Sequence, residues 1–228
     1  IDRVNKPFLP IASGALSARA AWALILSAAA AGLALVRSLF SPLIFALYTF
    51  GTTMGGLYSV PPVQLKRFPL AAGATIATCR GFLLNFGVYY ATREALGKAF
   101  QWNPQVAFLA RFMTVFGLVI AVTKDLPDID GDRAGGIETF STRAGPHKVA
   151  KGASVALGLN YAAAVASALL APAGTFRTWW MVTAHAAAGG WLARSYLRLD
   201  TASKPSIKQF YAQIWNLFYF EYMAYLFI

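Results

Sequence analysis

Long runs of uncharged, largely apolar residues alternate along the chain with short charged segments. Seventeen residues without charge separate Arg19 from Arg37, and twenty-eight separate Arg37 from Lys66. Another twenty-five lie between Lys151 and Arg177. A helix needs roughly 17–25 apolar residues to cross the hydrocarbon core of a membrane, so these runs predict transmembrane helices. We expect seven, over residues 18–36, 42–58, 69–91, 105–123, 148–171, 177–197 and 207–228.

Helix breakers and periodicity favour helices over strands. Pro42, Pro69, Pro104 and Pro172 fall at or outside the ends of the expected helices, where helix breakers belong. The apolar runs lack the period-two alternation that strands of a membrane barrel would show. No internal repeat or separate soluble domain is visible. We therefore expect residues 1–228 to form a single transmembrane domain.

Composition points to the same class of protein. Hydrophobic residues make up 57% of the 228 residues and charged residues only 13%, whereas a soluble domain carries about 25% charged residues. This balance excludes a water-soluble domain, and it excludes disorder, which needs low hydrophobicity and high charge. The single cysteine, Cys79, excludes a disulfide scaffold and a Cys-based zinc site. The chain is expected to be an all-α integral membrane protein.

Charged residues gather on one face of the expected bundle. Seven crossings place alternate loops on the same side, and that side collects fourteen Lys and Arg residues against five on the opposite side. Seven of the nine acidic residues lie there too. The net charge of +11 therefore reflects a positive-inside bias, which makes this face cytoplasmic or its organellar equivalent. We expect the chemistry at this mouth of the bundle.

Four of the nine carboxylates lie within eight residues, directly after the fourth expected helix. At 100° per residue, Asp125, Asp128 and Asp132 fall within about 60° of one another, and Asp130 points roughly the other way. Three carboxylates on one face repel each other unless a cation lies among them. Such hard oxygen ligands suit Mg²⁺, which binds through a few carboxylates and substrate phosphates. The alternative is a solvated acidic loop.

Basic residues on the same face complete a candidate diphosphate site. A hard cation surrounded by lysines and arginines is typical of such a site, because charge-assisted contacts neutralise phosphate oxygens. Each basic residue taken singly could instead be an anchor that contacts lipid headgroups. The candidates are Lys6, Lys66, Arg67, Lys124, Arg133 and Arg143.

Arg80 is the deepest charge in the expected spans, too far from either end of its helix to reach the interface easily. An arginine at such depth is costly and indicates a functional site, although a structural partner is an alternative. With Asn85, it could meet a substrate carboxylate or the diphosphate. His185 and Glu221 are better explained as structural hydrogen-bonding groups.

Several motifs together resemble the UbiA-type intramembrane aromatic prenyltransferases. The three aspartates, followed by residues 136–139 and 143–145, are similar to the second aspartate motif of that family. Residues 2–10 look like the tail of its first motif, and residues 58–67 resemble its third polar loop. Residues 80–87 and 214–219 are most similar to the branch that acts on homogentisate.

The resemblance implies an Mg²⁺-dependent enzyme that transfers a polyprenyl group from its diphosphate to homogentisate, with decarboxylation. Within that branch it favours a solanesyl donor, for plastoquinone biosynthesis, over a phytyl donor. The implied metal ligands are Asp2, Asp125, Asp128 and Asp132. The implied catalytic groups are these last three aspartates and Arg80, and the implied groups for the aromatic substrate are Arg80, Asn85 and Tyr58.

The family has nine helices, so we expect the first two, the remainder of the first motif and any transit peptide to lie outside this sequence. The implied location is the plastid membrane, at the inner envelope, with the charged mouth toward the stroma. The polyprenyl tail would need an apolar tunnel, for which the aromatic candidates are Phe82, Phe86, Tyr89, Tyr90, Phe112, Phe116 and Tyr219.

Two other functions remain open from the sequence. A sister prenyltransferase of the tocopherol branch would use the same chemistry with a phytyl donor. A membrane transporter would also gather acids and bases, but transporters place charges near the bilayer midplane on discontinuous helices. Here only Arg80 lies deep.

Overall fold

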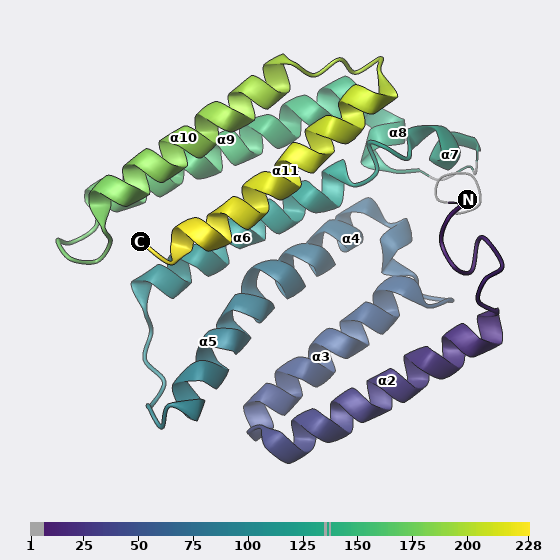
Figure 1. The fold of residues 1–228 in the computed structure, drawn as a ribbon, viewed down its shortest axis with the longest axis horizontal. Helices are drawn as coiled ribbons and strands as arrows, with labels where there is room; N and C mark the ends of the chain where they lie inside the picture. The colour runs from purple at the N-terminus through teal and green to yellow at the C-terminus, as the bar shows by residue number, and fades with distance from the viewer. Residues whose placement is uncertain (1–6, 135, 137) are drawn as a thin grey trace.

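The structure, a computed structural model, describes residues 7–134, 136 and 138–228. Within that part of the chain, seven long helices run the length of the molecule and confirm the seven expected (Figure 1). They are α2 (Ala18–Leu39), α3 (Pro42–Ser59), the continuous helix formed by α4 (Pro69–Ile76), η2 (Ala77–Leu83) and α5 (Leu84–Ala95), α6 (Pro104–Thr123), α9 (Pro146–Leu170), α10 (Thr178–Leu197) and α11 (Lys204–Tyr225).

Three short helices lie in the connections: η1 (Leu65–Arg67), α7 (Ile129–Ala134) and α8 (Phe140–Ala144). The ends of the long helices follow local sequence signals. Ser17 and Asn103 cap α2 and α6 with their side chains, and proline occupies the first turn of α3, α4, α6, α9 and α11. The expected boundaries are therefore met within a few residues.

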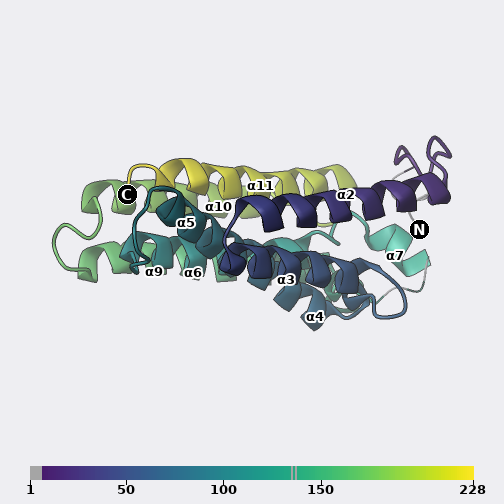
Figure 2. The ribbon, with the colours of Figure 1, turned by 90° about the horizontal axis from the view of Figure 1, so that it is seen from below.

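The connections alternate between two ends of the bundle. The α3–α4 connection, the segment with α7 and α8, and the α10–α11 connection share one end, here called the charged end (Figure 1). The α5–α6 and α9–α10 connections lie at the opposite end with the C-terminus. Figure 2 shows that the arrangement is flat, with α2 and α3 at one edge. Among the described helices, α2, α6 and α9 are long and apolar enough to cross a membrane, by length and composition.

The core lies among α6, α9, α10 and α11. Phe112, Phe116, Leu157, Met181 and Leu217 are almost completely buried there. The peripheral helices differ, because α2 buries only Ala21 and α3 buries no residue. Small residues line α9 and α10, and such residues let membrane helices approach closely where burial of apolar surface gives little drive. The apolar sides of α2 and α3 are consequently exposed.

The third long helix contains a π-helical turn, η2, at its middle. It packs tightly on α6, since a Cβ on Gly81 would lie 2.3 Å from the Thr114 Cα. The Asn85 amide donates to the Gly81 carbonyl at 2.6 Å and to the Arg80 carbonyl at 3.3 Å. These contacts give both carbonyls a side-chain donor at the turn, where the regular helical bonding changes.

Candidate functional site

The end of α3 meets the end of α6 at the charged end of the molecule. Lys124 follows α6, and its Nζ lies 2.9 Å from the Asp125 carboxylate. It also interacts with the hydroxyl of Tyr58, in the last turn of α3. Burial by itself lowers the pKa of the Lys124 ammonium, but Asp125 and Tyr58 outweigh burial, and the net pKa is raised. The structure thus joins three of the expected site residues in a charged, half-buried group.

The acidic segment is only partly helical. A helix through all four aspartates was implicit in the expected 100° spacing, but residues 124–128 form turns and α7 begins at Ile129. The Asp128 N–H donates to the Asp125 carbonyl at 3.3 Å, and the Asp132 N–H donates to the Asp128 carbonyl at 3.0 Å. Pro127 explains the difference, because a proline disfavours helical backbone in the residue before it.

Burial separates Asp130 from the other three carboxylates. Asp132 is buried, Asp125 and Asp128 are half-buried, and Asp130 is exposed. The Asp130 carboxylate pairs with the Lys204 ammonium at 3.2 Å, at the start of α11. This pair joins the acidic segment to the α10–α11 connection.

The carboxylates of the acidic segment suit a cation that binds together with a phosphate-containing substrate. Within the described ranges, no three acidic, histidine or cysteine side chains are placed to hold a metal ion alone. Mg²⁺ usually keeps several waters and binds through one or two carboxylates plus substrate phosphates. The carboxylate oxygens of Asp125, Asp128 and Asp132 are of the kind that suits this mode of binding, but the described structure does not bring all three together around one point. Asp2, the fourth expected ligand, lies outside the described residues.

The basic candidates are spread around the charged end. Lys66 and Arg67 form the exposed η1 turn, and Arg133 is exposed at the end of α7. Arg143, in α8, makes an exposed ion pair with Glu138. Lys6 lies outside the described residues. None of these described side chains is buried, so all can reorient toward an anion.

Arg80 lies in η2, away from the charged end. Its guanidinium lies 5.6 Å from the centre of the Trp215 ring on α11, a cation–π arrangement. Asn85 is buried below it, and the Tyr222 hydroxyl donates to the Asn85 Oδ1 at 3.4 Å. The expected pairing of Arg80 with Asn85 is met through the Arg80 carbonyl, while the guanidinium itself remains exposed. Tyr58 is placed with Lys124 instead.

Sequence reasoning missed Trp215 and Tyr222 as members of this deeper group. Both come from α11, more than 130 residues along the chain from Arg80. Two signals were available: the depth of Arg80, because a charge inside a membrane span requires a partner, and the motif at residues 214–219, which contains Trp215. The spacing of residues along the chain does not indicate which helix carries the partner of Arg80.

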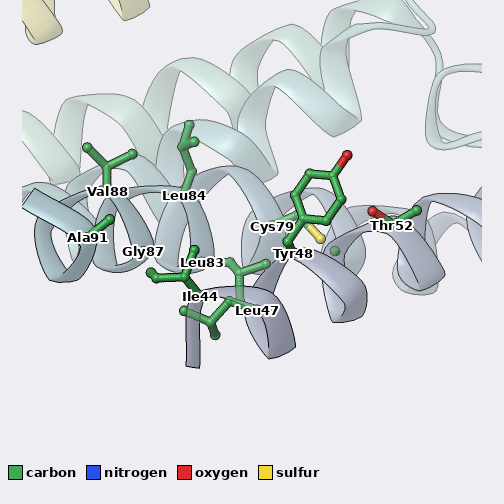
Figure 3. Close-up of a pocket in the computed structure, with 11 residues that line it drawn as sticks. Ile44, Leu47, Tyr48, Thr52, Cys79, Leu83, Leu84, Gly87, Val88 and Ala91 are labelled. Atoms are coloured by element: carbon green, nitrogen blue, oxygen red, sulfur yellow. The ribbon is translucent and has the colours of Figure 1, made fainter. Parts of the chain in front are cut away.

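An apolar groove of about 490 Å³ lies between α3 and the η2–α5 helix (Figure 3). Its walls include Ile44, Leu47, Leu83 and Leu84, with Tyr48, Thr52 and Cys79 contributing the polar atoms. The groove extends from Cys79, next to Arg80, to Ala91 near the opposite end of α5.

Most of the expected tunnel aromatics lie elsewhere. Phe112 and Phe116 are 1% and 0% exposed and pack inside the core of α6, α9, α10 and α11, so their assignment to a tunnel was wrong. Phe86 and Tyr90 instead pack against the Phe100 ring, from the α5–α6 connection, in edge-on and tilted arrangements. Apolar periodicity cannot separate a tunnel wall from a packed core.

Comparison with known proteins finds one matching family and several similar prenyltransferases. The model of the UbiA prenyltransferase family matches residues 1–217. "Probable homogentisate phytyltransferase 2, chloroplastic" of Oryza sativa subsp. japonica is 53% identical over 98% of this chain and 59% of its own length. "Homogentisate solanesyltransferase, chloroplastic" of Arabidopsis thaliana is 49% identical over 100% of this chain and 59% of its own length.

A third relative is covered more fully. "Homogentisate phytyltransferase" of Synechocystis sp. (strain ATCC 27184 / PCC 6803 / Kazusa) is 36% identical over 99% of this chain and 72% of its own length. The chain spans 59% of the length of the two plant relatives. No solved structure matches it significantly. The family match over residues 1–217, on an all-helical bundle in the described part of the chain, shows that this chain belongs to the UbiA prenyltransferase family.

Proposed function

We propose that the protein to which this chain belongs transfers a polyprenyl group from its diphosphate to homogentisate. One arrangement carries the proposal: carboxylates and bases gather at one end of the bundle, and an arginine, Arg80, and an apolar groove lie farther along its helices. An allylic diphosphate has the same division into a charged head and an apolar tail. The names of the relatives support homogentisate as the acceptor.

The diphosphate head would bind at the charged end. Asp125, Asp128 and Asp132, with Asp2, would hold Mg²⁺, which supplies electrostatic stabilisation of the departing diphosphate. Lys66, Arg67 and Lys124 would bind its oxygens, aided by Lys6, Arg133 and Arg143. Arg143 would exchange its Glu138 partner for phosphate. The loss of this ion pair would cost little free energy, because both side chains are exposed.

The aromatic acceptor would bind near the deeper group. Arg80 would bind its acetate carboxylate, held in position by Trp215, while Asn85 supports the turn that carries Arg80. Tyr58 would contact the acceptor from the charged end. When the allylic C–O bond breaks, its electron pair leaves with the diphosphate, and the electron-rich ring attacks the carbon that becomes cationic. The attacked ring carbon then loses its proton, the acetate carboxylate leaves as carbon dioxide, and the remaining methylene carbon takes up a proton to become a methyl group. Apolar surroundings keep water from the cation.

The polyprenyl tail would lie in the groove between α3 and η2–α5. Its η2–α5 wall, from Cys79 to Ala91, is about 18 Å long at about 1.5 Å per residue. The groove starts beside Arg80 and leads away from the charged end, as a tail attached to a diphosphate at that end requires.

We propose solanesyl diphosphate as the donor, with phytyl diphosphate as the alternative. Relatives named for the two donors are 49% and 53% identical to this chain, so the test must offer both donors in competition. The full-length membrane protein is incubated with labelled homogentisate, both diphosphates, and Mg²⁺ or a chelator. Preferential solanesyl transfer with carbon dioxide release supports the proposal. Phytyl preference moves the enzyme to the tocopherol branch, and no Mg²⁺-dependent product with either donor overturns the reaction.

The same proposal includes a location. The plant relatives are named as chloroplastic, which supports a plastid membrane. We place the protein at the inner envelope with its charged end toward the stroma. Protease protection of a tag in the α10–α11 connection, in intact plastids, tests this orientation.

A further inference from the structure

A polar cavity of about 300 Å³ lies between the last turns of α10 and the first turns of α11. It is at the charged end, where the α10–α11 connection crosses between the two helices (Figure 1). Polar and aromatic side chains form its lining: Trp191, Arg194, Ser195, Arg198, Gln209 and Gln213. Nothing in the proposed reaction uses any of these residues.

Positive charge dominates this cavity. Arg194 lies in the last turn of α10, and Arg198 follows directly after this helix, four residues along. No acidic residue lines the cavity with them. Both arginines are exposed, and neither makes an ion pair within the described part of the chain. The nearby Asp200 carboxylate accepts from the Ala202 N–H and so is held within its own turn. Two guanidinium groups consequently face a cavity without a matching anion.

The inner part of the cavity is closed by a defined contact. The Trp191 indole N–H donates to the Gln213 Oε1 at 2.9 Å and joins the two helices. Phe210 and Leu199 add apolar surface. Outside the cavity, Leu197 is 82% exposed on α10. A polar, cationic opening beside exposed apolar surface and a tryptophan is typical of the membrane interface.

We propose that this cavity binds the phosphate headgroup of an anionic phospholipid in the leaflet at the charged end. Arg194 and Arg198 would bind the phosphate oxygens, and the amide of Gln209 would donate a further hydrogen bond. The acyl chains would lie along the exposed surface around Leu197. Basic pockets between membrane helices bind anionic headgroups in this way. The ligand chemistry is a phosphate anion, and the adjoining apolar surface favours a lipid over a free ion.

The test measures lipid binding by the full-length protein in an uncharged detergent. Phosphatidylglycerol, phosphatidylcholine and inorganic phosphate are titrated separately, with binding followed by native mass spectrometry and by the shift in melting temperature. R194Q/R198Q is compared with K151Q/K208Q, which removes the same charge from exposed positions outside the cavity. Q209E, which places a carboxylate in the lining with little change in shape, provides a second variant if the arginine pair proves necessary for folding.

We expect R194Q/R198Q to weaken phosphatidylglycerol binding by about tenfold or more, because two charge-assisted contacts are lost. Q209E should weaken it as well, whereas K151Q/K208Q should change it less than about twofold. Equal losses in the two double variants would overturn the proposal in favour of diffuse attraction to the charged end. Equal stabilisation by inorganic phosphate would identify a free-anion site, and equal binding of phosphatidylcholine would remove the role of the charge. Prenyl transfer is not the readout, so this test is independent of the proposed reaction.

Discussion

Arg80 is the residue whose position most directly tests the reaction. Its guanidinium contacts Trp215 and is otherwise exposed, so it is able to bind a substrate carboxylate. We expect Arg80→Gln to lower kcat/KM by about 100-fold, the usual effect of removing one donor to a reacting anion. Arg93→Gln is the control on the same long helix, because Arg93 bonds the Ala99 carbonyl at the opposite end. Comparable losses in the two variants would remove Arg80 from the site.

The aspartates of the acidic segment are expected to differ in importance. Asp128→Ala and Asp132→Ala should each abolish turnover, because their carboxylates lie on the buried side of the segment. Asp130→Ala should be mild, since Asp130 is exposed and forms a surface pair with Lys204, which contributes about 1 kcal/mol or less. Turnover is measured on variants with normal melting temperatures. Equal losses at all three positions would contradict separate roles.

Gly81 is the position where a single methyl group should matter most for stability. A Cβ there would lie 2.3 Å from the Thr114 backbone on α6, so the two helices would have to separate. We expect Gly81→Ala to destabilise the protein by about 1–3 kcal/mol, the usual cost of overpacking, and to lower the melting temperature. Gly158→Ala on α9 is the matched control, because a Cβ there meets no atom within 4 Å. Its melting temperature should be unchanged or raised.

At the scale of elements, one buried polar pair joins α10 and α11. The His185 Nε2 lies 3.3 Å from the Glu221 Oε2, and the two side chains are 1% and 3% exposed. The His185 Nδ1 lies 2.6 Å from the Met181 carbonyl, which fixes the ring. The structural role expected for both residues is thereby supported. Phe108 and Phe112 of α6 pack against the His185 ring, and both members of the pair are buried, so water is excluded from either group if its partner is removed.

The loss of stability on removing both members of this pair should therefore be smaller than the sum of the losses on removing each one alone. We expect His185→Leu and Glu221→Leu each to destabilise the bundle by about 3–5 kcal/mol, since each leaves a buried polar group without its partner. The double variant should be clearly more stable than the sum of the two effects predicts. Melting temperatures in detergent measure all three variants. Additive losses would show that the contact between His185 and Glu221 does not itself stabilise the bundle.

At the scale of the whole molecule, the groove between α3 and α5 should select the length of the donor. Gly87 lines it, and a Cβ there would meet only the Leu47 side chain at 3.8 Å, so the groove has room at this point. We expect Gly87→Leu to reduce transfer of a solanesyl group at least about tenfold more than transfer of a shorter prenyl group, because the added side chain shortens the groove. Product analysis with donors of different lengths measures this ratio, with Gly158→Leu as control. An unchanged ratio would place the tail elsewhere.

Much of the fold and of the charged end could be predicted from local pattern. The seven helices appear where uncharged runs and prolines place them, and the charged connections share one end, because alternate loops of a helical bundle must do so. Residue type similarly indicated the acidic segment and Arg80 as candidate site residues. The turn before α7 was missed, since helical spacing was assumed across Pro127.

The sequence by itself thus determined the class of protein, the helices, and the end at which charge collects, because these follow from the cost of placing charges and unpaired backbone in a membrane. Only the tertiary structure decided which distant residues meet. It placed Trp215 against Arg80, Tyr58 beside Lys124, and Phe112 in the core rather than along a groove. The reason is that helix rotation and neighbours are set by side-chain packing among all the helices, and no stretch of sequence contains that information locally.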